Sequence, residues 1–464
     1  MGNESNNVNQ AITDKTTYDK TVSNMKIGVC EMQGWRKTME DAAIVLPNFE
    51  KNSSLFGILD GHGGSIISEF VSVNFKNILI RLDSYKNGNY EKALTETFLI
   101  MDELLKNKKV NNFIYTTHNS KVKQKEIPKN QNNQNDYGNI VKLKFETGVF
   151  EYDLNKIDLS IGGDDTSTTL YEYKRRNSII PNNADERNNI QMEDIFFEKG
   201  GKQNAALNTL PLFEDVFNIR KYDINFNENN SSNKLIKNES STSTHSKTSL
   251  DNFVANEMGT TANIMLIKNG IIYIANVGDS LSVMYKNKKA YNLNREHQTI
   301  IESEKERVLK SGANIIGYRI NGMLNLTRAI GDLQFKSNSN LKRHEQSVIA
   351  IPEITKIEDT DGIDFIIMGC DGVWDCVKRQ LVCDFVDRKI KENPDKDLSD
   401  ILKVIFDRCV SPVSGVLLGT DNMSCMIIQF LHNEQKNGDN IIIKKVNINE
   451  EIIENIDKEN ILKN

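Results

Sequence analysis

The sequence predicts an α+β domain in which hairpin-linked strands and pairs of amphipathic helices form layers. One observation is a set of short apolar runs, such as "SLFGILD" (residues 54–60) and "DFIIMGCD" (residues 364–371), which indicate buried strands. The other is a set of longer segments whose apolar residues recur every three or four positions, as they do on one face of a helix. Strands joined by hairpins, with helices in pairs between them, favour this class over a doubly wound one.

The clearest hairpin lies in "TANIMLIKNGIIYIANVGD" (residues 261–279). Asn269-Gly270 separates its two apolar runs and predicts a tight turn, because both residues accept positive φ angles. A further strand is predicted over "MSCMIIQF" (residues 423–430), shortly after Asp421.

Helices are predicted over four segments, residues 65–82, 93–105, 381–390 and 399–410. The apolar faces of the first two are formed by Ile67, Val71, Phe75 and Leu79, and by Leu94, Phe98, Met101 and Leu105. For the last helix we expect Ser399 or Asp400 at the N-cap, because their side-chain oxygens can accept a bond from a free backbone N–H. His297, in "REHQTI", is expected at the start of another helix.

Composition divides the 464 residues into one domain, an insertion and two end segments. Residues 107–250 contain polar tracts such as "PKNQNNQNDYGN", which bury too little apolar surface to offset ordering entropy. We therefore predict a mostly disordered insertion, within which "VKLKFETGVFEYDL" (residues 141–154) could form short strands or a docking patch. The domain spans residues 23–432, with a flexible N-terminal segment, residues 1–22, before it and a tail, residues 433–464, after it.

Charge and hydropathy exclude two classes of partner. The net charge of −6 provides no general basic field for nucleic acid. Apolar runs such as "GIIYIANV" are far below the roughly 18 residues that a membrane span needs, so we expect no transmembrane segment. We expect a monomer.

The six cysteines have no disulfide-framework spacing, which suits reduced thiols in the cytosol or the nucleus. Gly2 permits N-myristoylation, but Asn6 stands where serine or threonine is preferred and no basic patch supports a lipid anchor. An unmodified N-terminus is therefore the expectation.

The stretch "CEMQGWRKTMED" (residues 30–41) contains two competing chemistries. Cys30 and Arg36 have the spacing at which a cysteine-based phosphatase sets its thiolate against a phosphate-binding arginine. Glu40 and Asp41 instead form a carboxylate pair suited to a hard metal ion. The flanking sequence alternates like a strand, with no helix start after Cys30 to supply a loop of backbone N–H groups. This pattern favours a metal site at Glu40 and Asp41 over nucleophilic attack by Cys30.

Aspartates at strand ends are the strongest chemical signal. Asp60, Asp279 and Asp371 each follow an apolar run, and Asp421 precedes one. A single Asp at such a position is usually part of a turn. Several acids held close together would repel one another unless a cation lay between them, and oxygen-only ligands favour Mg²⁺ or Mn²⁺.

A set of ordered motifs resembles the metal-dependent protein phosphatases of type 2C. These are "GWRKTMEDA", "GILDGHGG", "GTTAN", "NVGDS", "EKERVLKSGANI", "LNLTRAIGD", "PEI", "DFIIMGCDGVWD" and "TDNMSCMII". The resemblance implies two antiparallel sheets packed face to face as a central β-sandwich, flanked by pairs of helices, with metal ions in a cleft at one edge. It covers nearly all of residues 23–106 and 251–432 and none of the insertion.

The resemblance also implies a ligand set for two Mg²⁺ or Mn²⁺ ions. Asp60 would bridge both ions, Asp371 and Asp421 would complete the protein ligands of one, and the Gly61 carbonyl would serve the other.

Further acids complete the implied site. Glu40 and Asp41 would act around the second ion, largely through water, and Asp279 would help to hold a third, weaker ion together with Asp371.

The implied reaction is hydrolysis of phosphoserine and phosphothreonine on proteins by a metal-bridged hydroxide. Arg36 would grip the substrate phosphate, because its planar fork matches phosphate oxygens, and His62 would donate a proton to the leaving alkoxide. The substrates would be phosphoproteins.

Two alternatives stay open at this point. A cysteine-dependent phosphatase would use Cys30 and Arg36. A family relative that has lost catalysis would serve as a binding scaffold, but such relatives typically have a metal aspartate replaced, and none of the implied ones is missing here.

Overall fold

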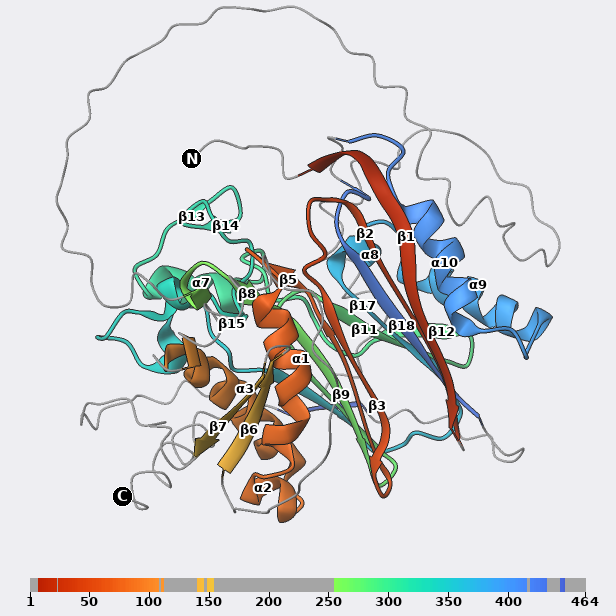
Figure 1. The fold of residues 1–464 in the computed structure, drawn as a ribbon, viewed down its shortest axis with the longest axis horizontal. Coiled ribbons are helices and arrows are strands. Elements are labelled where there is room, and N and C mark those ends of the chain that lie inside the picture. Colours follow the sequence, from red (N-terminus) through yellow and green to blue (C-terminus); the bar gives the residue numbers. More distant parts are fainter. Residues whose placement is uncertain are drawn as a thin grey trace, which may run out of the picture. The chain divides into compact units, whose positions relative to one another are not determined.

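The computed structural model describes residues 7–22, 24–107, 110–111, 140–145, 148–153, 254–414, 418–431 and 443–446 (Figure 1). These residues belong to one compact unit of the chain. The predicted disorder of residues 107–250 lies largely outside the described residues. Inside that segment, β6 (Ile140–Phe145) and β7 (Gly148–Asp153) pair as an antiparallel hairpin, which confirms the short strands predicted there.

Two antiparallel sheets form the centre of the described fold. In the order of their pairing, the strands of sheet A are β1 (Asn7–Val22), β2 (Met25–Arg36), β18 (Met423–Phe430), β17 (Ile363–Gly369), β11 (Leu281–Lys286) and β12 (Lys289–Asn292). Those of sheet B are β19 (Ile443–Val446), β16 (Glu353–Ile357), β10 (Ile271–Val277), β9 (Ala262–Lys268), β4 (Ser53–Leu59) and β3 (Ala42–Glu50). This is the predicted α+β sandwich.

The hairpin between β9 and β10 has the predicted turn. Asn269 has φ 53° and Gly270 has φ 79°, both in the left-handed region that a two-residue turn between twisted strands requires. A residue with a branched side chain at either position would strain this connection.

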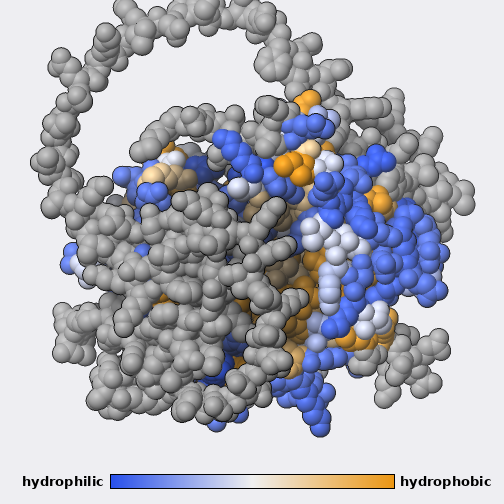
Figure 2. Space-filling view, viewed as in Figure 1, coloured by the Kyte–Doolittle hydropathy of each residue, from blue (hydrophilic) through white to orange (hydrophobic). Residues whose placement is uncertain are grey.

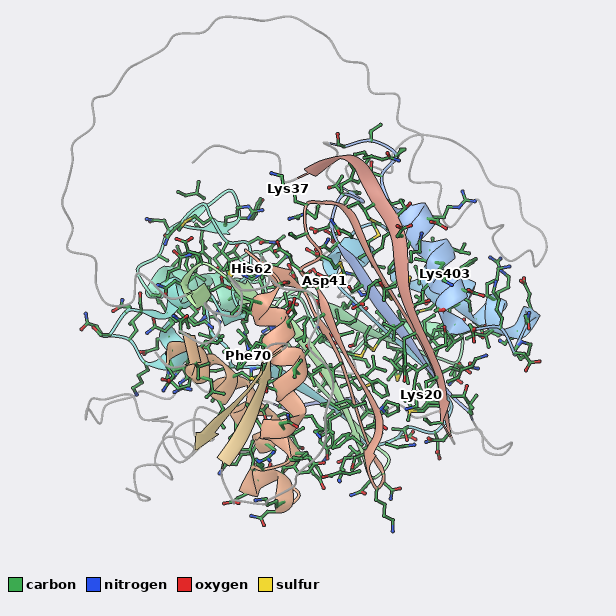
Figure 3. The ribbon with its side chains drawn as sticks, in the orientation of Figure 1. Lys20, Lys37, Asp41, His62, Phe70 and Lys403 are labelled. Atoms are coloured by element: carbon green, nitrogen blue, oxygen red, sulfur yellow. The ribbon has the colours of Figure 1, made fainter. Side chains whose placement is uncertain are left out.

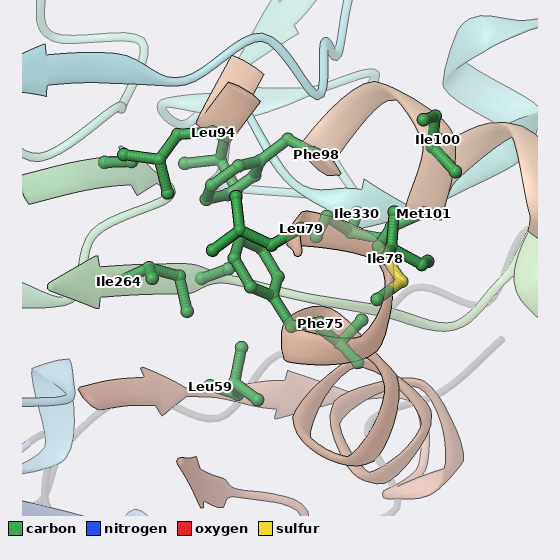
Figure 4. Packing of buried hydrophobic residues seen from close by; sticks show 14 of the residues in the cluster. Leu59, Phe75, Ile78, Leu79, Leu94, Phe98, Ile100, Met101, Ile264 and Ile330 are labelled. Atoms are coloured by element: carbon green, nitrogen blue, oxygen red, sulfur yellow. The ribbon is translucent and has the colours of Figure 1, made fainter. Parts of the chain in front are cut away.

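Helices α1 (Ile66–Leu79) and α3 (Tyr90–Lys106) cover one face of sheet B, with the short α2 (Asp83–Lys86) between them. All eight apolar residues predicted for the two helix faces are buried. The rings of Phe75 and Phe98 meet edge to face, with centroids 5.3 Å apart, in the centre of this layer (Figure 4).

Leu55 and Leu59 of β4 join this cluster. Phe56 and Ile58 of the same strand are also buried but point the other way, toward sheet A.

Helices α9 (Arg379–Glu392) and α10 (Leu398–Cys409) cover the outer face of sheet A, and their surface is largely hydrophilic in Figure 2. A Cβ atom at Gly28 would lie 2.5 Å from Cβ of Leu398, so a glycine lets strand β2 approach α10 closely. The predicted N-cap at Ser399 or Asp400 is wrong, because the helix already begins at Leu398 after Asp397. The Ser399 N–H donates instead to Asp19 of β1, 3.0 Å away.

The predicted flexible segment, residues 1–22, is wrong for Asn7–Val22, which pairs with β2 as the edge strand β1. No described side chain of β1 is buried, so the strand lacks the apolar alternation by which a strand is recognised. It is stabilised by its backbone ladder and by ion pairs such as Lys15 to Asp407, 2.6 Å. The predicted tail, residues 433–464, likewise contributes β19 to sheet B, paired with β16.

Small elements complete the edge of the sandwich that carries the acidic residues. Three two-residue strands form a separate small antiparallel sheet in the order β15 (Ile330–Gly331), β8 (Gly259–Thr260) and β5 (Gly61–His62). The remaining helical elements of the described residues are α7 (Glu302–Lys310), α8 (Asp371–Trp374), η4 (Val254–Asn256), η5 (Leu333–Lys336) and η6 (Arg343–Glu345). Strand β13 (Ile315–Ile316) pairs with β14 (Arg319–Ile320).

The buried aromatic pair generates a stability prediction. Replacing Phe98 with Ala should lower the free energy of unfolding by about 3–5 kcal/mol, because a fully buried ring is lost and a cavity remains. Leu309, which is exposed on α7, provides the control, and Leu309→Ala should change stability by about 0.5 kcal/mol or less. Urea denaturation followed by circular dichroism measures both. Equal effects of the two substitutions would contradict the packing described here.

Candidate active site

The strand directions bring the acidic residues to one edge of each sheet. In sheet B, β4 and β10 both pair antiparallel with β9, so they run in the same direction and end at the same edge. Asp60 directly follows β4, and Asp279 lies two residues past β10.

In sheet A, β17 and β2 both pair antiparallel with β18, so their C-terminal ends lie beside its N-terminal end. Asp371 therefore lies near Asp421 and Arg36, which close the ends of β18 and β2. The two edges meet, because ligand atoms of Asp60, Cys370 and Asp371 all lie within 4.8 Å of one another. Figure 3 shows Asp41 and His62 at this same end of the sheets, and Lys20 of β1 at the opposite end.

Burial and mutual repulsion oppose ionisation of these acids. Burial, reinforced by Asp421 and Asp371, raises the pKa of Asp41 to about 8. Burial and the charge of Asp421 raise the pKa of Asp371 to about 6. The pKa of Asp60 is also well above its ordinary value, because the residue is buried and faces Asp41, Asp371, Asp421 and Asp279. A cation placed among these carboxylates would relieve the repulsion.

Asp41 gives the clearest test of whether a metal ion fits here. It is 8% exposed, and neither carboxylate oxygen has a partner in the described residues that meets hydrogen-bond geometry. Buried carboxylates are normally paired with a donor or a cation. The surrounding donors are chiefly carboxylate oxygens, which are the ligands that Mg²⁺ and Mn²⁺ prefer. The residues therefore fit a divalent ion.

Gly61 and Glu40 lie against each other beside Asp60. A Cβ atom at Gly61 would lie 2.2 Å from the Glu40 carbonyl oxygen, so only glycine allows this approach. The Glu40 carboxylate accepts bonds from the Thr38 hydroxyl, 2.6 Å, and from the Gly64 backbone N–H, 2.9 Å. It is therefore already oriented by the loop that carries Gly61.

Arg36 lies at the solvent-accessible side of the site. Its Nη2 donates to Oδ2 of Asp421 over 2.5 Å, and the two side chains are 43% and 36% exposed. A guanidinium fixed beside the acids and open to solvent is suited to binding a phosphate oxygen.

His62 follows the Asp60 turn and pairs with an acid that the sequence did not single out. Its Nε2 lies 2.9 Å and 2.8 Å from the two carboxylate oxygens of Asp332, which is 2% exposed. Burial alone would lower the pKa of His62, but the charge and hydrogen bond of Asp332 outweigh it and raise that pKa. The only sequence signal for Asp332 is its place in "LNLTRAIGD", one of the motifs behind the resemblance.

Asp279 is held by Gln298, whose Nε2 donates to its Oδ2 over 3.0 Å. Burial and the charge of Asp371 raise the pKa of Asp279 well above its ordinary value. Asp375, which the sequence also did not single out, belongs to the same charged group. Desolvation, Asp371 and Glu296 raise the pKa of Asp375 to about 7.

A buried polar network supports the loop that carries Asp279. The Asn276 amide donates to the carbonyl of Gly278, 3.0 Å, and the Asn294 amide donates to that of Ser280, 2.9 Å. Asn263 links the two, and its amide donates to both asparagine oxygens at 3.0 Å. These amides are buried with partners, so they fix the loop rather than serve as ligands.

His297 is also part of this support. The predicted helix start at His297 is wrong, because α7 begins at Glu302 and His297 is fully buried. Its Nδ1 accepts from the Gly278 N–H, 3.2 Å, which holds the turn before Asp279.

Cys30 is not placed for nucleophilic attack. It lies in the middle of β2, fully buried between Thr17 of β1 and Cys425 of β18. Burial raises the pKa of its thiol to about 12, so the reactive thiolate is disfavoured. The cysteine-dependent alternative is therefore incompatible with the structure.

Comparison with known proteins places these observations in a family. A family model described as Protein phosphatase 2C matches residues 25–122 and 171–415. "Probable protein phosphatase 2C 21" of Arabidopsis thaliana is 29% identical over 418 residues, which is 90% of each chain. "Probable protein phosphatase 2C 4" of Paramecium tetraurelia is 26% identical over 91% of this chain and 97% of its own. A solved serine-threonine phosphatase 2C from Toxoplasma gondii aligns with a TM-score of 0.47 at 12% identity, over 90% of this chain and 99% of that one.

The family match and the curated relatives define the class of protein, a metal-dependent protein serine/threonine phosphatase. Because the family model matches well over half of its residues, the chain belongs to the protein phosphatase 2C family. The gap in that match, residues 123–170, is shorter than the insertion that composition predicts. Among the described residues, no helix combines the length and the apolar character needed to cross a bilayer.

The raised pKa values predict how the metal-free protein responds to pH. In the unfolded chain Asp41 loses its proton near pH 4, whereas in the folded chain it does so near pH 8. The unfolded state therefore binds fewer protons between these values, and stability should fall as pH rises from about 6 to about 8. Each kcal/mol by which the free energy of unfolding falls should lower the Tm by roughly 2–4 °C.

Differential scanning calorimetry with chelator present measures this slope. The Asp41→Asn protein should show a shallower decrease over the same pH range, because the substituted amide does not ionise. An identical slope in both proteins would show that Asp41 is not a repelled, buried acid.

Proposed function

We propose that this chain hydrolyses phosphoserine and phosphothreonine on proteins at a centre of two Mg²⁺ or Mn²⁺ ions. Asp60, Asp371, Asp421 and the Gly61 carbonyl would hold the ions. Glu40 and Asp41 would act around one of them, and Asp279 with Asp371 would hold a third. When bound, the ions would supply an activated water and offset the charge that gathers on the phosphoryl group.

One observation carries this proposal. Buried and half-buried carboxylates from separate chain segments converge at one edge, and neither buried oxygen of Asp41 has a hydrogen-bond partner among the described residues. Such a cluster is costly in an isolated protein, since each added negative charge disfavours the next. Divalent cations offset this cost, and a phosphate dianion can approach the edge only when they do.

The chain's own residues would complete the reaction. Arg36, with its guanidinium beside Asp421 and open to solvent, would bind the phosphate oxygens and orient the substrate. His62, whose side chain is 28% exposed, would protonate the leaving serine or threonine oxygen, which is a poor leaving group without a proton.

Asp375 adds a further acid to the place proposed for the third ion. Its carboxyl is coupled by charge to Asp371 and Glu296, and Asp279 is coupled to the same two acids. We propose that Asp375 contributes to holding that ion, directly or through water.

The location of the enzyme and its partners follow from the same proposal. All six cysteines are free thiols, which suits a reducing compartment, so we propose action on phosphoproteins in the cytosol or nucleus. We propose that the protein acts as a monomer, without nucleic acid.

The proposal predicts opposite effects of two inhibitors. With a phosphothreonine peptide and Mn²⁺, excess EDTA should abolish release of inorganic phosphate, because the acids alone cannot activate water. Iodoacetamide should leave the rate unchanged, because Cys30 is buried. Loss of activity on alkylation with full activity in EDTA would overturn the proposal.

A substitution separates catalysis from the inactive-scaffold alternative. Asp371→Asn should lower kcat by about 100-fold or more, within the range that removal of a charge-stabilising group costs. Asp361→Asn, at an exposed turn, is the matched control and should retain wild-type rates. A wild-type protein without phosphatase activity at any Mn²⁺ or Mg²⁺ concentration would favour the scaffold.

A further inference from the structure

We propose that Asp332 is a positioning residue that fixes the imidazole of His62 for proton transfer to the leaving oxygen. This inference rests on the proposed function, since it assumes that His62 is the proton donor. It adds a residue that lies outside the acidic cluster and belongs to a different motif, and it assigns the two ring nitrogens different tasks.

The hydrogen-bond geometry separates those tasks. Nε2 of His62 lies 2.9 Å from Oδ1 and 2.8 Å from Oδ2 of Asp332, so both carboxylate oxygens face the same ring nitrogen. Nδ1 of His62 makes no hydrogen bond within the described part of the chain and the ring is 28% exposed, whereas Asp332 is 2% exposed. The Asp332 carboxylate therefore lies on the buried side of the His62 ring, and Nδ1 is the ring nitrogen available to contact the substrate.

The proposed step is balanced with Nδ1 as the donor. As the bond between phosphorus and the serine or threonine oxygen breaks, its electron pair moves to that oxygen. The Nδ1 proton of the imidazolium passes to the same oxygen, and the oxygen of a water molecule forms the new bond to phosphorus. The phosphate product then releases one of that water's protons to solvent, and uptake of a proton from solvent restores the imidazolium. The ring becomes neutral and keeps its Nε2 proton, which is hydrogen-bonded to the Asp332 carboxylate. This hydrogen bond fixes the tautomer and the orientation of the ring.

The small sheet β15-β8-β5 builds this pair. Gly259 of β8 pairs with His62 on one side and with Gly331 on the other, so only Gly259 separates these two residues in the sheet. Asp332 directly follows Gly331 and therefore lies close to His62. A Cβ atom at Gly259 would lie 2.3 Å from Oδ2 of Asp332 and 2.8 Å from Nε2 of His62. The absence of a side chain at Gly259 is thus what lets the carboxylate reach the ring.

The backbone around Asp332 is held in an unusual shape. Gly331 and Asp332 have φ angles of 88° and 51°, and the second is uncommon for any residue other than glycine. Asp102 of α3 stabilises this turn, because its Oδ1 accepts from the Gly331 N–H, 3.0 Å, and from Nζ of Lys336, 2.6 Å. Lys336 also donates to the Ala329 carbonyl, 2.7 Å, so the segment is clamped on both sides of Asp332.

A comparison of leaving groups tests the proposal, because only a poor leaving group needs the proton. With Mn²⁺, Asp332→Asn should lower kcat on a phosphothreonine peptide by about 100-fold, the lower range for loss of general-acid catalysis. On p-nitrophenyl phosphate, whose leaving group needs no proton, the same substitution should lower kcat by about 3-fold or less. His62→Gln should give the same split, and the double variant should be no slower than His62→Gln alone.

Controls keep the outcomes distinct. Mn²⁺ binding by calorimetry and the Tm of Asp332→Asn should match those of the wild type, and Asp361→Asn should change neither substrate's rate. If Asp332→Asn does not fold, Gly259→Ala tests the same contact, because its methyl would displace the carboxylate and should produce the same split.

Equal losses on both substrates, or additive losses in the double variant, would overturn the positioning role while leaving the proposed phosphatase function intact. A wild-type protein that hydrolyses neither substrate with Mn²⁺ would overturn both.

Discussion

Repulsion between buried carboxylates is the constraint around which the structure is arranged. Asp41, Asp60, Asp279 and Asp371 have raised pKa values because they share one poorly solvated edge. Such a cluster persists only if the scaffold is rigid enough to prevent the acids from moving apart. The two sheets provide that rigidity, since each acid is attached at or near the end of a strand whose neighbours are fixed by a backbone ladder.

The support for the site consists of polar groups that are themselves hydrogen-bonded. Asn263, Asn276 and Asn294 bind the Asp279 loop, and Asp102 with Lys336 clamps the turn before and after Asp332. Buried polar groups with complete hydrogen bonding restrict a loop to one shape, whereas a half-satisfied group would destabilise it. Asp41 is the exception, because both of its buried carboxylate oxygens lack a hydrogen-bond partner in the described part of the chain.

Much of this could be predicted from the sequence, for physical reasons that differ between elements. The apolar faces of α1 and α3 could be predicted because one side of each helix packs on sheet B. The Asn269-Gly270 turn was readable because its φ angles demand those residues. Strand β1 was missed because its described side chains are not buried and its stability comes from the backbone. Asp332 was missed because its pairing with His62 depends on three short strands far apart in the chain.

The N-cap of α10 was predicted at the wrong residues because the acceptor, Asp19, belongs to a strand nearly the whole chain away. Local sequence does not contain such long-range contacts, so the boundaries of an element are harder to predict than its existence.

Counting Mn²⁺ ions bound to the chelator-stripped protein by equilibrium dialysis tests the central claim most directly. The account predicts at least two ions per chain in the wild type and fewer in Asp60→Asn, with the fold unchanged by circular dichroism. A wild-type protein that binds no Mn²⁺, or an Asp60→Asn protein that binds as many ions as the wild type, would contradict it.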